Sequence, residues 1–171
     1  MTLETFKTEV LPLKDKLFRF ALSIVRDSMT AEDVVQEVMI KIWQNEDNTE
    51  IKKMEAWAMQ LTKNLSIDKT RSKHYRTVDV IHVAYKVDQT STHDVQYEAR
   101  EEVDYVRSLM DELPEKQKQV IHLREIEEME YSEIADALNI SMVDVKVNLF
   151  RARQRLKEQL TKIKSYGIGK N

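Results

Sequence analysis

Apolar side chains recur every three or four residues through most of this chain, which is the spacing of one face of an α-helix. This spacing predicts helices over Leu3–Val25, Ala31–Gln44, Glu55–Arg76 and Val95–Asp111, another that starts at Pro114, and a final pair around Asn139. The 171 residues include only two Gly and two Pro, so few tight turns or hairpins are expected. The pattern therefore predicts an all-α protein of one domain or two small ones.

The apolar face of each predicted helix should contribute to a core. The residues on these faces are Leu13, Leu17, Phe20, Ala21, Ile24, Ala31, Val34, Val35, Val38, Ile42, Trp43, Trp57, Leu61 and Leu65. Pro12 should break or kink the start of the first helix, because proline has no N–H to donate. Thr30 followed by Asp33 resembles a capping box that would begin the second helix.

The segment around Asn139 has the pattern of two helices joined by a tight turn. Glu133–Leu138 reads as the end of a short helix, after which Asn139 can adopt the left-handed conformation at little cost. Ser141 can then cap a second helix by accepting a hydrogen bond from a backbone N–H two or three residues later. Together these features predict a helix-turn-helix, a unit that places its second helix in the DNA major groove.

The predicted second helix of this unit has two distinct faces. One is an apolar stripe of Val145, Leu149, Ala152, Leu156 and Leu160. The other carries Lys146, Val147, Phe150, Arg151 and Gln154. Lys and Arg can donate to guanine or phosphate, and Val or Phe can contact thymine methyl groups, so this face suits DNA. Taken alone, the helix could also be an ordinary amphipathic helix with a basic outer surface.

The net charge of −3 does not by itself indicate a nucleic-acid partner, but the charges are unevenly distributed. Leu61–Arg76 has five basic residues against one Asp, and Ser141–Asn171 has eight basic residues against two acidic ones. Between them, Thr77–Ile140 contains sixteen acidic residues. Two basic patches separated by an acidic stretch indicate two contacts with a polyanion.

Between the two halves, Thr77–Asp94 shows no helical period and reads as a flexible linker. The predicted organisation is an N-terminal domain over residues 1–76, a linker over 77–94 and a C-terminal helix-turn-helix domain over 95–171. An extended linker of this length reaches at most about 60 Å, which exceeds one DNA turn of roughly 34 Å. The two domains could therefore contact separate DNA segments.

The composition limits the classes of chemistry. The absence of Cys excludes disulfides and thiolate metal sites, and no signal peptide or long apolar run is apparent, so a cytoplasmic protein without membrane insertion is expected. There is no Gly-rich phosphate loop or His-Glu-x-x-His spacing, and the four His are scattered. We expect neither an enzyme nor a bound metal or cofactor.

Two further features of the sequence are not explained by packing in a core. Asp33, Gln36, Glu37 and Ile40 form a stripe on the outer face of the second helix, which is either a solvated surface or a protein-docking surface. Asn64 lies near the middle of a predicted helix, where Asn has low propensity, so it is expected to have a specific role.

These motifs, taken in order, resemble the extracytoplasmic-function group of bacterial RNA polymerase sigma factors, the two-domain form of the sigma-70 family. In the first half the resemblance rests on Ala31–Val38, on Ile42 and Trp43, and then on Trp57, Asn64, Asp68 and Arg71. In the second half it rests on Leu113-Pro114, Glu133–Ala135, Ile140-Ser141, Val145-Lys146 and Arg151–Arg153. Each piece is short, but their order and spacing extend over nearly the whole chain.

The resemblance implies a sigma factor that binds core RNA polymerase and directs promoter-specific transcription initiation. Asp33, Gln36, Glu37 and Ile40 would dock on the clamp helices of the polymerase β′ subunit, and the β flap would be a second contact. The loop Asn45–Met54 would capture a flipped base of the −10 element, and Trp57, Lys63, Asn64 and Arg71 would open and hold the single strand. Lys146, Val147, Phe150 and Arg151 would read the −35 element as duplex. An anti-sigma factor is an expected further partner.

Some positions depart from the family pattern. Asp144 and Asn148 stand where Thr and Arg are common, Lys69 replaces a common aromatic residue, and Glu130 takes the place of a capping Ser. Glu130 is therefore expected to remove the capping box with Glu133.

Two other classes of protein, a DNA-binding regulator and a protein-interaction module, fit the sequence less well. A stand-alone helix-turn-helix regulator would need a ligand pocket or dimer seam in its first half, for which the stripe around Gln36 is poorly suited. A protein-interaction module would not explain the two basic segments.

Overall fold

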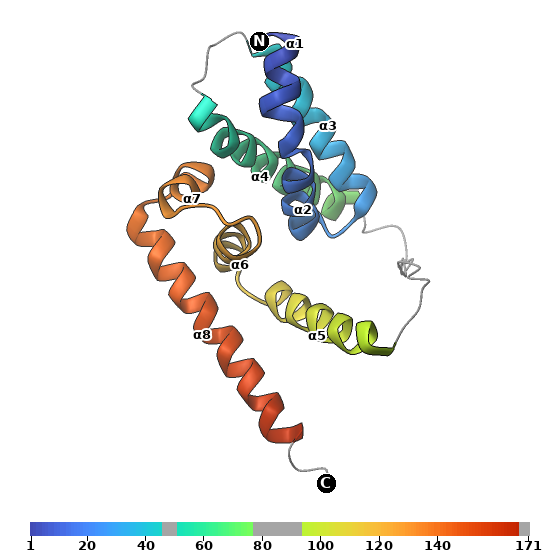
Figure 1. The fold of residues 1–171 in the computed structure, drawn as a ribbon, viewed down its shortest axis with the longest axis vertical. Coiled ribbons are helices and arrows are strands. Elements are labelled where there is room, and N and C mark those ends of the chain that lie inside the picture. The colour runs from blue at the N-terminus through green and yellow to red at the C-terminus, as the bar shows by residue number, and fades with distance from the viewer. Residues whose placement is uncertain (46–50, 77–93, 168–171) are drawn as a thin grey trace.

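The computed structural model describes residues 1–45, 51–76 and 94–167, and all regular secondary structure in these segments is helical (Figure 1). The α-helices are α1 (Leu3–Thr5), α2 (Lys14–Val25), α3 (Ser28–Gln44), α4 (Ile51–Arg76), α5 (Asp94–Asp111), α6 (Glu115–Ile121), α7 (Tyr131–Leu138) and α8 (Met142–Gly167). The predicted all-α fold is confirmed for this part of the chain. Residues 46–50, half of the expected Asn45–Met54 loop, and residues 77–93 of the Thr77–Asp94 linker lie outside the described residues. The other half of the expected loop was partly wrong: Ile51–Met54 form the first turn of α4, which therefore begins four residues before the predicted start at Glu55.

The first predicted helix, Leu3–Val25, is divided rather than continuous. Between α1 and α2 the chain forms a π-helical turn over Phe6–Val10 and a 3₁₀ turn over Leu11–Leu13. Pro12 lies in the 3₁₀ turn, as its missing N–H predicts.

The start of α3 differs from its prediction. The helix begins at Ser28, and the side chain of Asp27 accepts a hydrogen bond from the Thr30 N–H at 2.9 Å. The expected Thr30–Asp33 capping box is therefore wrong, because the acidic cap lies one turn earlier in the chain. Hydrogen bonds from the hydroxyl and the N–H of Thr30 lower the pKa of the Asp27 carboxyl.

Helices α2, α3 and α4 form an N-terminal bundle whose core contains most of the predicted residues. Leu17, Phe20, Val34, Val38 and Ile42 are buried without exposed surface. Trp43 is an exception: it remains 45% exposed, and its ring packs against that of Phe6 in a T-shaped arrangement with centroids 5.3 Å apart. The π-helical turn thus covers only one side of the indole.

Helix α4 buries a different set of residues from the one predicted. Met54, Ala56, Ala58 and Met59 are buried, whereas Trp57, Leu61 and Leu65 are only partly buried and pack at the edge of the core. The reason is that α4 contacts α2 and α3 from its own half and also α7 from the other half. Because it is covered from two directions, its apolar side chains do not follow a single stripe, which misled the sequence prediction.

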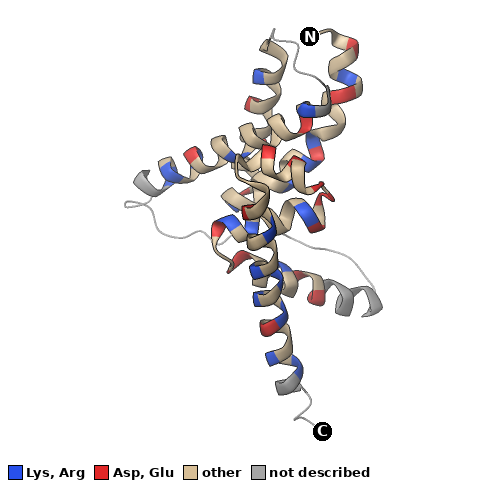
Figure 2. Ribbon diagram, turned by 90° about the vertical axis from the view of Figure 1, so that its left-hand side faces the viewer, with Lys and Arg blue, Asp and Glu red and all other residues tan. Residues whose placement is uncertain are grey.

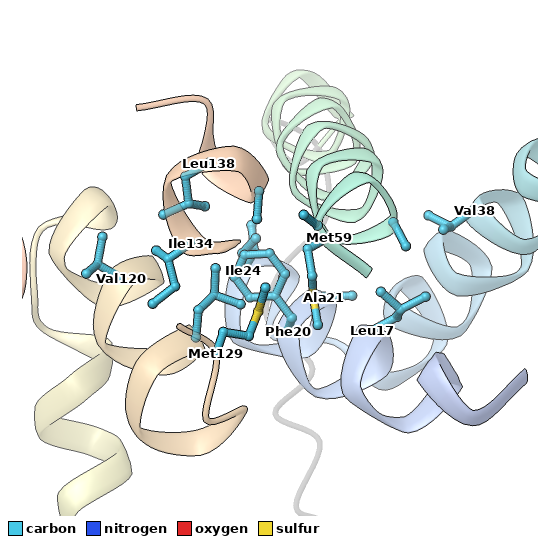
Figure 3. Close-up of a cluster of buried hydrophobic side chains, with 14 of the residues drawn as sticks. Leu17, Phe20, Ala21, Ile24, Val38, Met59, Val120, Met129, Ile134 and Leu138 are labelled. Carbon is cyan, nitrogen blue, oxygen red and sulfur yellow. The ribbon is translucent and has the colours of Figure 1, made fainter. Parts of the chain in front are cut away.

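Helices α6, α7 and α8 form the C-terminal bundle. Val120, Ile121 and Leu123 are buried, together with Ile134, Ala137 and Leu138 of α7. The two bundles share one continuous cluster of buried side chains, in which Phe20 and Ile24 of α2 lie beside Met129 and Ile134 (Figure 3). The described helices include none that is both long and apolar enough to cross a membrane.

Candidate nucleic-acid interface

The turn between α7 and α8 has the predicted geometry. Asn139 adopts the left-handed conformation at φ 53° and ψ 51°, and the Ile140 N–H donates to the Ala135 carbonyl at 3.0 Å. The hydroxyl of Ser141 accepts a hydrogen bond from the Asp144 N–H at 3.0 Å, which caps α8. The helix-turn-helix is confirmed, and local hydrogen bonds fix the entry of α8.

The start of α7 differs from expectation. Glu130 and Glu133 form a capping box after all, in which the Glu133 carboxylate accepts from the Glu130 N–H at 2.8 Å. A Glu can replace the usual Ser here because its longer side chain also carries an acceptor oxygen.

The two faces of α8 are separated as the sequence predicts. Val145, Leu149 and Ala152 are buried, and Leu156 and Leu160 are partly buried. On the outer face, Phe150 is 68% exposed and Val147 37% exposed, and Lys146 and Arg151 are exposed beside them. Figure 2 shows Lys and Arg distributed along this helix. Val143, Val147 and Phe150, spaced four and three residues apart on this helix, are all exposed, and exposed apolar side chains grouped on one surface mark an interaction site.

Other polar side chains on α8 form ion pairs or hydrogen bonds with other described residues, unlike Lys146 and Arg151 of the outer face. Arg153 forms an ion pair with Glu125, and the Asn148 side-chain amide donates to the Asp144 carbonyl at 2.8 Å. The hydrogen bond to Glu125 raises the pKa of Arg153. Within the described part of the chain, Lys146 and Arg151 form no ion pair, so their charges are available to a ligand.

The four residues predicted to hold single-stranded DNA all lie on α4 but differ in accessibility. Asn64 and Arg71 are exposed, and Trp57 is half-buried. Lys63 is also half-buried, and its ammonium group donates to the Leu138 carbonyl of α7 at 3.0 Å. Burial, followed by the nearby charge of Lys116, lowers the pKa of Lys63.

The predicted docking stripe lies on the outer face of α3. Asp33, Gln36 and Ile40 are exposed, Ile40 to 54%. Glu37 lies 3.6 Å from the ammonium of Lys69 on α4 and 3.9 Å from that of Lys41. Lys69, which departs from the family pattern, therefore holds a carboxylate of this stripe in place.

Sequence reasoning missed a cluster of charged groups between the two bundles. The buried carboxylate of Glu127 accepts two hydrogen bonds from Arg19, at 2.9 and 2.8 Å, and lies 3.2 Å from Nε2 of His122. Burial would raise the pKa of Glu127, but the hydrogen bonds from His122 and Arg19 outweigh burial and lower it. Among the described residues, no cluster of three or more His, Asp or Glu side chains could hold a metal ion.

Comparison with known families places both halves of the chain. The model of sigma-70 region 2 matches residues 10–76, and the model of sigma-70 region 4 matches residues 104–156. These matches correspond to the N-terminal bundle and to the helix-turn-helix half.

Relatives match along most of the chain. The extracytoplasmic-function (ECF) sigma factor SigM of Bacillus subtilis is 32% identical over 146 residues, covering 82% of this chain and 86% of SigM. SigW of the same organism is 28% identical over 158 residues, covering 86% and 84% of the two chains.

Solved structures share the fold. The sigma factor RpoE from Bartonella quintana, in complex with the anti-sigma factor NepR, has a TM-score of 0.71 at 25% identity, with 93% of this chain and 98% of that one covered. CnrH in complex with the cytosolic domain of CnrY has a TM-score of 0.68 at 23% identity, with 94% and 90% covered. The chain therefore belongs to the ECF group of the sigma-70 family, and it is a sigma factor that directs transcription initiation by RNA polymerase.

Proposed function

We propose that three separate surfaces of this sigma factor carry out its three tasks. The outer face of α8 reads the −35 element as duplex, α4 holds the melted −10 strand, and the stripe on α3 docks on the β′ clamp helices of core polymerase. The β flap is a second polymerase contact. The observation that carries this proposal is the exposure of Phe150 and Val147 between Lys146 and Arg151, two cations that form no ion pair with the residues that the structure describes.

The −35 assignment follows from the chemistry of the major groove. Lys146 and Arg151 can donate to the acceptor atoms of guanine, and Phe150 and Val147 can contact thymine methyl groups. The turn and the Ser141 cap hold α8 rigidly, so these four side chains keep a fixed relation to the duplex.

The −10 assignment rests on α4. Separated bases need partners for their edges and faces, which Asn64 and Trp57 offer, and their phosphates need cations such as Arg71 and Lys63. Residues 46–50 of the segment that would capture a flipped base lie outside the described residues, and the role of this segment is part of the proposal.

Replacing Gln36 and Glu37 together with alanine should weaken assembly with core polymerase while the free energy of unfolding changes by about 0.5 kcal/mol or less. The reason is that both side chains lie outside the core of α3, where Gln36 is exposed and Glu37 half-exposed. Assembly would be measured by native gel shift of core polymerase, and stability by urea unfolding. The matched control is alanine at Glu158 and Gln159, the same two residue types exposed on α8. Equal assembly of both double variants would reject the docking assignment.

An anti-sigma factor is a further proposed partner. Support comes from the structure of RpoE in complex with NepR. The match to RpoE covers 93% of the present chain. Such a partner would compete with polymerase or DNA for the same surfaces.

The proposed function is tested by run-off transcription with purified core polymerase on genomic fragments. We expect discrete transcripts only when both core polymerase and this protein are present. The alternative function is that of a stand-alone regulator. Such a protein would bind its duplex without polymerase, and its addition to core polymerase would produce no new transcripts.

A further inference from the structure

A cavity of about 360 Å³ is lined by residues of α2, of the end of α5, of α6 and of the π-helical turn His122–Ile126. The described residues that line it belong to none of the faces proposed for the −35 element, the −10 strand or the clamp helices. Cavities that bind small molecules have volumes of about 300–1,000 Å³ and are often lined by more than one domain. This cavity is therefore large enough for a small organic ligand.

Positive charge predominates among the polar residues of this cavity. The cations that line it are Arg19, Arg26, Arg107 and Lys118. Among the described lining residues Asp111 is the one carboxylate, and Glu127 accepts two hydrogen bonds from Arg19. Setting these two carboxylates against the four cations leaves an excess of two positive charges, with histidine neutral. Like charges that converge on one space repel each other, so the arrangement favours an anion between them.

The nearly buried charge of Lys118 is incompletely partnered. Its side chain is only 4% exposed, and its ammonium group lies 3.5 Å from Oδ1 of Asp111. Among the described residues, Lys118 has this ion pair and no hydrogen bond. Because an ammonium group carries three N–H donors and a buried charge needs hydrogen bonds as well as a counter-ion, one contact at 3.5 Å is a weak set of partners. Lys118 therefore has donors left for a ligand in the cavity that it lines.

Two arginines can complete an anion site beside Lys118. Arg26 donates through Nη2 to the backbone carbonyl of Asp111 at 2.7 Å, which holds its guanidinium group at the cavity. A carbonyl is neutral, so this hydrogen bond leaves the charge of Arg26 uncompensated. Arg107 on α5 is exposed and forms no ion pair with the residues that the structure describes. A guanidinium has five donors in a planar fork that matches the oxygens of a phosphate or carboxylate, so both arginines keep donors for a ligand.

The rest of the cavity wall is mainly apolar. Leu22, Met110 and Ile126 line it from three different elements, and Ile126 is 40% exposed. The hydroxyl of Ser23, which also lines the cavity, already donates to the Phe20 carbonyl at 2.7 Å. A bare inorganic anion would leave the apolar wall in contact with water, whereas an aromatic or aliphatic group would cover it favourably. The wall therefore suits a ligand with an apolar body, and the excess charge suits an anionic end.

We propose that this cavity binds a small phosphate monoester with an aromatic or aliphatic body. A phosphate monoester carries close to two negative charges at neutral pH, which matches the excess of two positive charges, whereas a carboxylate carries one. Its oxygens accept hydrogen bonds from Lys118, Arg26 and Arg107. Its body covers Met110 and Ile126. The site goes beyond promoter recognition and polymerase docking and does not depend on how those tasks are assigned to the other surfaces.

Carbon-13 NMR of the methionine methyl groups of the full chain locates the ligand directly. Met110 lines the cavity, whereas Met59 has no exposed surface and lies in the core, and both signals can be assigned by Met→Leu substitution. Added 1-naphthyl phosphate should shift the Met110 signal through its ring current and leave the Met59 signal in place. We expect half-saturation at about 1 mM or below, the affinity typical of a ligand of this size. Inorganic phosphate, which has only the charge, and 1-naphthol, which has only the body, should each bind roughly tenfold more weakly.

Two matched variants test the contribution of the cations. Arg107→Gln removes one charge from the cavity, and Arg155→Gln removes the same charge from α8, at a residue that is equally classed as exposed and does not line the cavity. Arg107→Gln should weaken binding of 1-naphthyl phosphate roughly tenfold, because a charge-assisted hydrogen bond is lost, and Arg155→Gln should leave it unchanged. Lys118→Met, which keeps the apolar stem without the charge, should abolish binding.

Circular dichroism checks that each variant folds, and Arg107→Gln decides the question by itself because the residue is exposed. Equal affinity of Arg107→Gln and Arg155→Gln for 1-naphthyl phosphate would overturn the site, as would a Met110 signal that does not move. Inorganic phosphate or 1-naphthol binding as tightly as 1-naphthyl phosphate would overturn the assigned class of ligand. Run-off transcription tests the proposed function separately, so the two can fail independently.

Discussion

Replacing Lys146 and Arg151 together with alanine is expected to abolish most transcription from promoters that depend on the −35 element. Each side chain should contribute about 1–3 kcal/mol where it contacts a base edge, so the double variant should lose at least tenfold in promoter binding by the holoenzyme. The physical reason is that both cations are exposed on the outer face of α8, and neither forms an ion pair within the described residues. The measurement is run-off transcription on promoters with the native and a scrambled −35 element.

A control must remove the same charge from the same helix. Alanine at Lys157 and Lys164, which are exposed further along α8, removes two positive charges outside the proposed reading face. This variant should weaken binding equally on native and scrambled promoters and should lower its salt dependence. Unchanged preference for the native −35 element in the Lys146 and Arg151 variant would reject the assignment.

Phe20→Ala is expected to be the most destabilising of the substitutions considered. Phe20 has no exposed surface and packs in the core shared by both halves, so its truncation leaves a large cavity. Phe→Ala changes in cores cost about 3–5 kcal/mol, which is a large fraction of the stability of a small protein. Urea unfolding monitored by circular dichroism would measure the loss.

Phe150→Ala is the matched comparison, because it makes the same chemical change at a residue that is 68% exposed. Its free energy of unfolding should change by about 0.5 kcal/mol or less, whereas −35 recognition should weaken. A loss of stability comparable to that of Phe20→Ala would contradict the exposure of Phe150 and remove the basis for the −35 assignment.

The sequence predicts the helix-turn-helix well because its geometry is local. The left-handed Asn139, the Ser141 cap and the apolar stripe on α8 depend on residues within a few positions of each other. The same holds for the outer stripe of α3, whose exposure follows from helical periodicity once Val34 and Val38 are buried on the opposite face.

The seam between the halves could not be predicted in this way. Arg19 and Glu127 are 108 positions apart, and neither belongs to a local motif. Glu127 looks like one more residue of an acidic stretch, so its burial becomes visible only when the packing of the two halves is known. Sequence analysis related the acidic stretch to the two basic patches only through net charge. The described contacts instead pair Glu127 of that stretch with Arg19, and Glu125 with Arg153.

The predictions for α4 failed in part for a related reason. Trp57 and Leu61 were expected in the core of one bundle, but the helix is shared between two bundles and buries Met54 and Met59 more completely. A periodicity argument assumes one buried face, and α4 has contacts on more than one. The predicted burial of Trp43 failed for a different reason. The π-helical turn that contacts its ring has no clear sequence signature.

The two halves of this chain are expected to contact two promoter elements in the same complex with polymerase. Photo-crosslinking in the open complex tests it most directly, with a photoreactive amino acid at position 150 on α8 or at position 64 on α4. We expect crosslinks from position 150 to the −35 duplex and from position 64 to the melted −10 strand, in complexes that contain core polymerase. Crosslinks from both positions to the same element, or no crosslink from position 64 to the melted strand, would contradict it.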